Sequence, residues 1–321
     1  MANSPELDAL CVGPLTLLGV PFSHDLSKAR AAVLGLPFDC GTHLFRVGAR
    51  QGPSAIREQS RLVRPFNPEL SDYNPMQRLG LVDCGDVRMV PSRILEAFEA
   101  IEAAARVIVS AGVIPVTMGG DGSVSLPMMR ALHATHGPLA VIHVDSHTDT
   151  MRFTAGDEYN AGTQFTHAAL EKLVDPAHVY HIGVRGSTYQ QGAFSYVREF
   201  GYQIITFNEL MQRGIPSVLE QLQSQLRGKP VVLCYDMDSF DPSCAPGVAT
   251  PSWGGLSARE GLQIVRGLAG LRLIAIDVNT VSPAHDHQGM TASLAAHVLY
   301  EALVVVCKSL GLDQPGVEEA P

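Results

Sequence analysis

Short apolar runs recur along the chain, and each ends in polar or turn-forming residues. The first, AAVLGLPFD (Ala31–Asp39), closes on glycine, proline and aspartate, which is typical of a buried parallel strand. Five further runs share this character: Val113–Met118, Leu139–Asp145, His178–Val184, Pro230–Asp238 and Leu271–Asn279. The pattern therefore predicts a series of buried strands.

Segments with helical spacing lie between these runs. Ile94 to Gly112 carries alanine and aliphatic residues at helical intervals and stops at glycine, a common C-terminal cap. The other helical segments are Leu126–His136, Gly192–Glu199, Ile215–Arg227, Ser257–Ala269 and Met290–Leu310. Alternating strands and helices predict an α/β fold with a parallel sheet covered on both faces. In such sheets ligands bind beyond the carboxyl ends of the strands.

The chain divides into one large domain with two short extensions. Residues 1–30 lack clear periodicity and are interpreted as an N-terminal arm. Residues 31–308 form the single predicted domain, and residues 309–321 a polar C-terminal tail. We find no internal repeat and no low-complexity linker.

Composition excludes several classes of function. The 321 residues have a formal net charge of −9 and contain no basic block, so nucleic-acid binding is not expected. No apolar run approaches the roughly 20 residues that cross a bilayer, and the N-terminus does not resemble a signal peptide. The six cysteines show no C-x-x-C spacing. We expect a cytoplasmic protein with no membrane partner, no disulfide framework and reduced thiols.

Two predicted strands end in clusters of carboxylates. Asp145, His147 and Asp149 follow the strand LAVIHV, and Asp236 and Asp238 follow PVVLCY. Buried carboxylates are costly unless a cation compensates their charge. Oxygen and imidazole ligands together suit Mn²⁺, Ni²⁺ or Zn²⁺. The two strand ends are therefore a candidate metal site.

A glycine-rich turn, Gly119-Gly120-Asp121-Gly122-Ser123, joins another strand to a helix. It is too short for the known dinucleotide or P-loop patterns. A phosphate-binding turn at a helix N-terminus stays possible on this pattern. The favoured interpretation is a tight turn in which Asp121 or Ser123 caps the helix.

Together these three blocks resemble the ureohydrolase family of arginases, agmatinases, guanidinobutyrases and proclavaminate amidinohydrolases. The family carries G-G-D-H-S, D-A-H-x-D and D-x-D-x-x-D-P-x-x-x-P-G-x-x-T-P-x-x-G-G-L. This chain has GGDGSVSLP from Gly119, DSHTDT from Asp145 and DMDSFDPSCAPGVATPSWGGLS from Asp236. The similarity extends over roughly residues 30–306 through GLPFD, GARQGPSAIR, DCGDV, HIGVRG and DVNTVSPAHD.

The resemblance implies a three-layer α/β/α fold, assembly into trimers or hexamers, and hydrolysis of a guanidino C–N bond at two Mn²⁺ or Ni²⁺ ions. Carried over by position, Asp145 and Asp236 would bridge both ions. His147 and Asp238 would complete one metal position, and Asp149 would serve the other.

Three positions depart from the family pattern. Gly122 replaces the histidine of G-G-D-H, which is a metal ligand, so this chain is expected to bind one ion or none. Ala161 replaces the histidine of H-G-T-x-F that shuttles protons to the leaving amine. Thr280 replaces a glutamate that holds the guanidinium group in many members, although guanidine and biguanide hydrolases resemble the threonine form.

Four further residues could replace the lost histidines or contact the substrate. His143 lies two positions back inside its strand, so we expect a core histidine and not a ligand. His167 is expected at the surface. Thr280 and Asp286 are candidate substrate-binding residues, although a surface aspartate is the favoured interpretation of Asp286. The rim loops Thr42–Val47, Met151–Thr166 and Thr250–Trp253 are expected to set selectivity.

Three hypotheses follow from these departures. The first is a weakly catalytic or non-catalytic subunit that assembles with an active ureohydrolase paralogue, which hydrolyses a guanidino or biguanide compound such as metformin. The second is a divergent stand-alone guanidino hydrolase that uses one metal. The third is a metal-free regulatory protein whose acidic crevice binds a cationic ligand.

Overall fold

The described part of the chain forms one parallel sheet. The computed structural model describes residues 14–41, 43, 45–153 and 155–314. Their eight strands follow the order β2-β1-β3-β8-β7-β4-β5-β6, and every neighbouring pair is parallel. The strands are β1 (Ala31–Gly35), β2 (Val82–Asp86), β3 (Ile114–Met118), β4 (Leu139–Val144), β5 (Val174–Val184), β6 (Gln203–Thr206), β7 (Val231–Asp236) and β8 (Leu273–Asn279).

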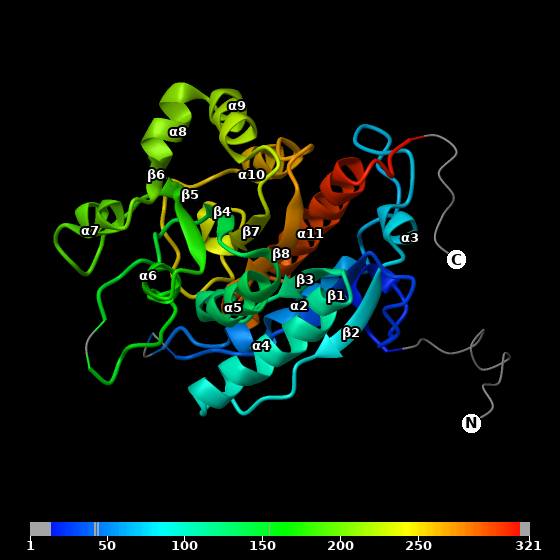
Figure 1. The fold of residues 1–321 in the computed structure, drawn as a ribbon, viewed down its shortest axis with the longest axis horizontal. Coiled ribbons are helices and arrows are strands. Elements are labelled where there is room, and N and C mark those ends of the chain that lie inside the picture. The colour runs from blue at the N-terminus through cyan, green and yellow to red at the C-terminus, as the bar shows by residue number, and fades with distance from the viewer. Residues whose placement is uncertain (1–13, 42, 44, 154, 315–321) are drawn as a thin grey trace, which may run out of the picture.

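Helices cover both faces of this sheet. One face packs against α2 (Gly52–Ser60), α3 (Pro75–Leu79), α8 (Phe207–Arg213), α9 (Ile215–Leu226), α10 (Ala258–Arg266) and α11 (Met290–Ser309). The other packs against α4 (Ile94–Ser110), α5 (Ser125–His136), α6 (Gln164–Leu170) and α7 (Ala193–Glu199). In Figure 1, α9 and α10 lie at the top of the view and α4 at the bottom, with strands between them. The predicted three-layer fold is confirmed.

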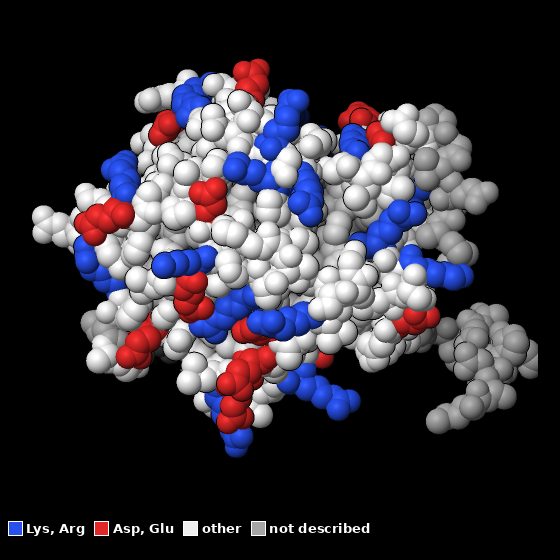
Figure 2. Space-filling model, viewed as in Figure 1, with Lys and Arg blue, Asp and Glu red and all other residues white. Residues whose placement is uncertain are grey.

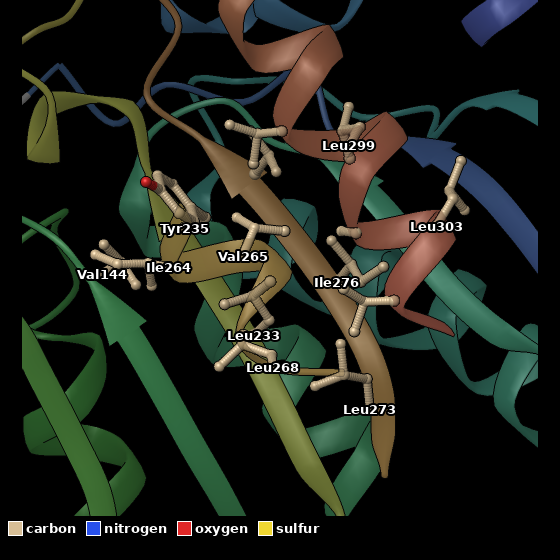
Figure 3. Close-up of a cluster of buried hydrophobic side chains, with 14 of the residues drawn as sticks. Val144, Leu233, Tyr235, Ile264, Val265, Leu268, Leu273, Ile276, Leu299 and Leu303 are labelled. Atoms are coloured by element: carbon tan, nitrogen blue, oxygen red, sulfur yellow. The ribbon is translucent and has the colours of Figure 1, made fainter. Parts of the chain in front are cut away.

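Side-chain alternation explains why the strands read as continuous apolar runs. In β1, Ala31 and Val33 join the core on one face of the sheet, whereas Ala32 and Leu34 join the core on the other. Because helices cover both faces, neither set of positions meets water. Figure 3 shows part of the first core, where Leu233 of β7 lies beside side chains of α10, β8 and α11.

Helix α11 is the long central helix of that first core. It has 20 residues, and an 18-residue window within it has a mean hydropathy of 1.7, which gives it the length and composition of a membrane span. This contradicts the expectation that no apolar run approaches such a length. The reason is local: 78% of the apolar window is buried inside the fold, so the helix needs few polar residues.

The six predicted strands and six predicted helices are all present, but other elements were missed. Strands β2 and β6 lie at the two edges of the sheet. Their sequences, VDCGD and QIIT, are polar or very short and lack the continuous apolar signal of central strands. Helices α2, α3, α6 and α8 were also missed; each has at most nine residues.

Both predicted extensions lie partly outside the described residues, which exclude 1–13 and 315–321. Within the predicted arm 1–30, Leu17 is fully buried in the core, and its main-chain N–H donates a 2.8 Å hydrogen bond to Asp83. On the molecular face that Figure 2 shows, basic and acidic side chains are interspersed. That distribution suits a mildly acidic surface without a single-sign patch on this face.

Candidate metal centre and cavity

The two carboxylate clusters lie side by side because their strands are neighbours. Strands β4 and β7 pair in register, with Val144 opposite Tyr235. Asp145 and Asp236 therefore follow at the same level, at the carboxyl edge of the sheet. Both carboxylates are buried. The family resemblance implied that Asp145 and Asp236 share a site, and the pairing of β4 with β7 places them next to each other.

One compact donor group consists of Asp145, His147 and Asp238, whose ligand atoms lie within 4.8 Å of one another. His147 Nδ1 lies 3.1 Å from Asp238 Oδ2 and 3.3 Å from Asp145 Oδ1. Ser146 holds this arrangement, since its main-chain N–H and hydroxyl both donate to Asp238 Oδ1, at 3.2 and 2.7 Å. This group holds three of the four residues expected at the complete metal position; Asp236, the fourth, is not part of it.

Asp236 is fixed by two hydrogen bonds to one oxygen. Its Oδ1 accepts from the main-chain N–H of Asp238 at 2.7 Å and from the hydroxyl of Thr280. Thr280 lies in the left-handed region with φ of 67°, an unusual conformation for a β-branched residue. Thr280 lines the cavity, but its hydroxyl is engaged with Asp236. The side chain therefore supports a carboxylate of the metal centre, a role that the sequence did not suggest.

A second donor group consists of His143, Asp145 and Asp149. His143 Nε2 lies 2.9 Å from Asp145 Oδ2 and 3.9 Å from Asp149 Oδ2, and its Nδ1 lies 2.9 Å from Nδ1 of His181. The expectation that His143 is buried is confirmed. Its Nε2 nevertheless lies close to the carboxylates, and the expectation that His143 is not a metal ligand stays a prediction.

Gly122 lies beside this second group. Asp121 accepts from the main-chain N–H of Ser123 at 3.2 Å, so the predicted capped turn is confirmed. A Cβ atom on Gly122 would lie 3.1 Å from Asp149 Oδ2 and 2.8 Å from Nε2 of Gln164. Gln164 itself donates to Asp149 Oδ2 at 2.5 Å. This glutamine was missed, since one polar residue at the start of a short helix gives no sequence signal of burial.

Ala161, at the proton-shuttle position, and His167 lie in different surroundings. Ala161 lines the cavity and offers no side-chain proton donor. His167 is buried, not exposed as expected: its ring is stacked between Phe153 and Tyr159, with centroid distances of 4.9 and 4.4 Å. Its Nε2 lies 2.8 Å from the carbonyl oxygen of Glu158. His167 is not among the described residues that line the cavity.

Asp286 is not brought to the centre either. Its carboxylate accepts from the main-chain N–H groups of His287, Thr291 and Ala292, at the start of α11. It is absent from the described cavity lining. Its geometry is that of a helix-capping residue, and substrate binding by Asp286 stays a prediction without support from this arrangement.

Two arginines organise the cavity wall through main-chain carbonyls. Arg185 donates to the carbonyl oxygens of Ser239 at 3.0 Å, Phe240 at 3.1 Å and Ser252 at 2.8 Å, among others. Arg46 donates to the carbonyls of Pro246, Val248 and Ala249. Neither arginine forms an ion pair with the metal-centre carboxylates; the ion pairs of Asp145 and Asp238 are with histidines.

Burial shapes the protonation of the carboxylates. It raises the pKa of Asp145 to about 7, and the nearby charge of Asp238 adds to that rise. Burial also raises the pKa of Asp236. For Asp238, burial acts in the same direction, but the charge and hydrogen bonds of His147 outweigh it and lower the pKa. Crowded carboxylates at a buried strand edge are a common sign of a functional site.

The donor groups open into a cavity of about 460 Å³. Its walls include residues from all three predicted rim loops: His43 and Arg46, then Met151 and Asn160–Gly162, then Thr250–Ser252. Thr42, Leu44 and Thr154 lie outside the described residues, and Trp253 is exposed but not part of the lining. A further wall, 187–190 with Ala193 and Phe194, was not predicted.

Comparison with known proteins gives a consistent result. The arginase family matches residues 29–305 of this chain. Guanidinobutyrase of Pseudomonas aeruginosa is 36% identical over 297 residues, covering 92% of each protein. The structure of proclavaminate amidinohydrolase from Streptomyces clavuligerus superposes with a TM-score of 0.87 at 32% identity, covering 93% of this chain and 98% of the other.

A third relative bears on the metal. Formiminoglutamase of Trypanosoma cruzi, solved with Mn²⁺, has a TM-score of 0.81 and 26% identity, and the match covers 90% of this chain and 97% of the other. The shared sheet, the buried His and Asp groups and the extent of these matches lead to one conclusion: this chain is a member of the arginase family.

Proposed function

We propose that this chain is a metal-dependent hydrolase that cleaves the C–N bond of a guanidino compound, with one divalent ion held by Asp145, His147, Asp236 and Asp238. The observation that carries the proposal is Asp145 Oδ2, a buried carboxylate oxygen that receives no hydrogen bond. A nitrogen of His143 lies close to it but without hydrogen-bonding geometry. Such an oxygen is costly to bury unless a cation binds it.

The donor set fits a borderline divalent ion. Carboxylate oxygens and one imidazole suit Mn²⁺, Ni²⁺ or Zn²⁺ better than Mg²⁺ or a thiolate-preferring ion. Among the described residues, the ion pairs of Asp145 and Asp238 involve histidines and no lysine or arginine. When bound, such an ion supplies the Lewis acidity that makes water a nucleophile at neutral pH.

The residues of the chain then have separate tasks. Asp157 and Asp238, which both line the cavity, give it a negative charge that attracts a guanidinium cation. Ser146 and Thr280 hold Asp238 and Asp236 in place through hydrogen bonds. The names of relatives such as guanidinobutyrase support a guanidino substrate. Ala161 supplies no proton to the leaving amine, so slow turnover is expected.

The test is turnover by the isolated chain. Purified protein loaded with Mn²⁺ or Ni²⁺ is incubated with guanidino acids of increasing length, and urea release is measured together with bound metal. We expect slow urea release that is lost in Asp238→Ala, while exposed Asp72→Ala keeps it. A chain that binds metal but releases no urea from any guanidino compound contradicts this proposal. A chain that binds no metal but binds guanidinium ligands supports the metal-free regulatory alternative.

A second candidate function rests on Gly122 and Ala161. With one family ligand and the shuttle histidine replaced, the chain suits a subunit that assembles with an active paralogue in a trimer or hexamer. A guanidino or biguanide compound such as metformin would then be hydrolysed in the partner. Native mass spectrometry of the protein from its own cell tests this. A second ureohydrolase chain in the complex supports it, and a stable, active homo-oligomer contradicts it.

A further inference from the structure

Gln164 lies where a side chain at position 122 would project. A Cβ atom added to Gly122 would meet Gln164 Nε2 at 2.8 Å and Asp149 Oδ2 at 3.1 Å. The glutamine amide therefore occupies space that a larger residue 122 would need. It reaches this place from the start of α6, which begins at Gln164 itself. The space beside Gly122 is therefore filled by the side chain of Gln164 and is not open.

The contact with Asp149 defines the orientation of this amide. Gln164 Nε2 donates to Asp149 Oδ2 at 2.5 Å, and the glutamine is only 2% exposed. Its other polar atom, Oε1, is buried and has no hydrogen-bond partner among the described residues. Leaving an acceptor unpaired costs free energy. The amide is thus held by its nitrogen, through a hydrogen bond to the buried Asp149 carboxyl group.

We propose that Gln164 closes the second half of the metal centre: its N–H group takes the place of a cation at Asp149, so the chain binds one ion, beside His147 and Asp238. This inference rests on the proposed function for the identity of the remaining site. It assigns Gln164 a positioning role, because its amide acts on Asp149 and not on substrate. The donor group of His143, Asp145 and Asp149 then stays without an ion.

Gln164→Glu tests the inference with almost no change in size. A carboxylate at this position cannot donate to Asp149, and it adds an oxygen ligand to the same space. We expect wild type to bind about one Mn²⁺ per chain in equilibrium dialysis with metal quantification, and Gln164→Glu to bind about two. The matched control is Gln203→Glu, an exposed residue on the edge strand β6, which should stay at the wild-type value.

A second variant covers the case in which Gln164→Glu fails to fold. Gly122→His combined with Gln164→Ala removes the amide and supplies an imidazole in its place, and should also gain about one ion. Folding is checked by circular dichroism with and without Mn²⁺. Two ions in wild type overturn the inference, as does an unchanged metal content in both folded variants.

The outcome also separates this inference from the proposed function. If wild type binds no ion, the proposed function fails, because its metal site is absent. The role of Gln164 is then judged only by the difference between variant and wild type. A gain of about one ion sustains it, and no gain overturns it.

Discussion

The guanidinium group of Arg185 donates a 2.9 Å hydrogen bond to the main-chain carbonyl of Asp238. The same side chain donates to the carbonyl of Ser252, so it joins the turn that carries a metal-site carboxylate to a loop of the cavity rim. Arg185 is partly buried, and its printed hydrogen bonds all go to main-chain carbonyls. The hydrogen bonds of Arg185 therefore connect the turn of the proposed metal site to the wall of the cavity.

Replacing Arg185 with lysine should lower both the stability of the fold and the affinity for Mn²⁺. Lysine keeps the charge but cannot donate to several carbonyls in a fixed fork. For Arg185→Lys we expect a loss of about 1–3 kcal/mol in the free energy of unfolding and weaker Mn²⁺ binding. Urea denaturation and metal titration measure the two effects. Exposed Arg227→Lys is the control, and equal behaviour of the two variants contradicts the prediction.

Two substitutions of Thr280 test its hydrogen bond to the Asp236 carboxylate. Thr280→Ser keeps the hydroxyl that donates to Asp236, whereas Thr280→Val removes it at nearly constant size. Because partners of metal ligands typically affect affinity by about 10–100-fold, we expect a loss of roughly tenfold for valine only. Isothermal titration with Mn²⁺ measures this. The role of the hydroxyl is refuted when serine and valine lose the same affinity.

Metal should stabilise the folded chain by mass action. At a free ion concentration about 100 times Kd, a single site adds roughly 2.7 kcal/mol to the free energy of unfolding. Chelator treatment should therefore lower Tm, and Mn²⁺ or Ni²⁺ should restore it. The shift should vanish in Asp238→Ala. A Tm that is unchanged by chelator and by added metal contradicts the prediction of a metal site in the folded protein.

A buried ion pair far from the metal centre tests the stability of the fold. Arg57 donates to Asp83 at 2.8 and 2.9 Å, and the Asp83 carboxylate also accepts from Leu17. Arg57→Ala leaves a buried charge unpaired, so we expect a loss of about 3–5 kcal/mol in urea denaturation. The comparison is Arg106→Ala, which breaks an exposed pair with Glu102 and should cost less than about 1 kcal/mol.

Periodicity was sufficient to predict the layers and the central strands, whereas the meeting of Asp145 with Asp236 was implied only by the family resemblance. Central strands carry a strong apolar signal because both their faces are covered. Edge strands such as β2 do not, since part of their surface lies outside the core. The burial of α11 could not be read from its sequence either, because a core helix and a membrane span have the same composition.

Within the site, sequence order predicted which residues meet but not how they are bonded. The left-handed backbone of Thr280 and of Asp149, with φ of 67° and 47°, depends on surrounding contacts that no local pattern encodes. The approach of Gln164 to Asp149 depends on the path of the loop before α6. The direction of His143 depends on its contact with His181, a residue on the neighbouring strand β5.

The hydrogen bond between Ser146 and Asp238 joins residues that are 92 positions apart in the chain. Strands β5 and β6 lie between β4 and its partner β7 in the chain, and they pair on the opposite side of β4 in the sheet. During translation at about 5–20 residues per second, the ribosome needs roughly 5–20 s to pass from one strand end to the other. A nascent chain therefore carries the Asp145–Asp149 carboxylates without their counterpart for that interval, so the proposed metal site would be completed only after synthesis of β7.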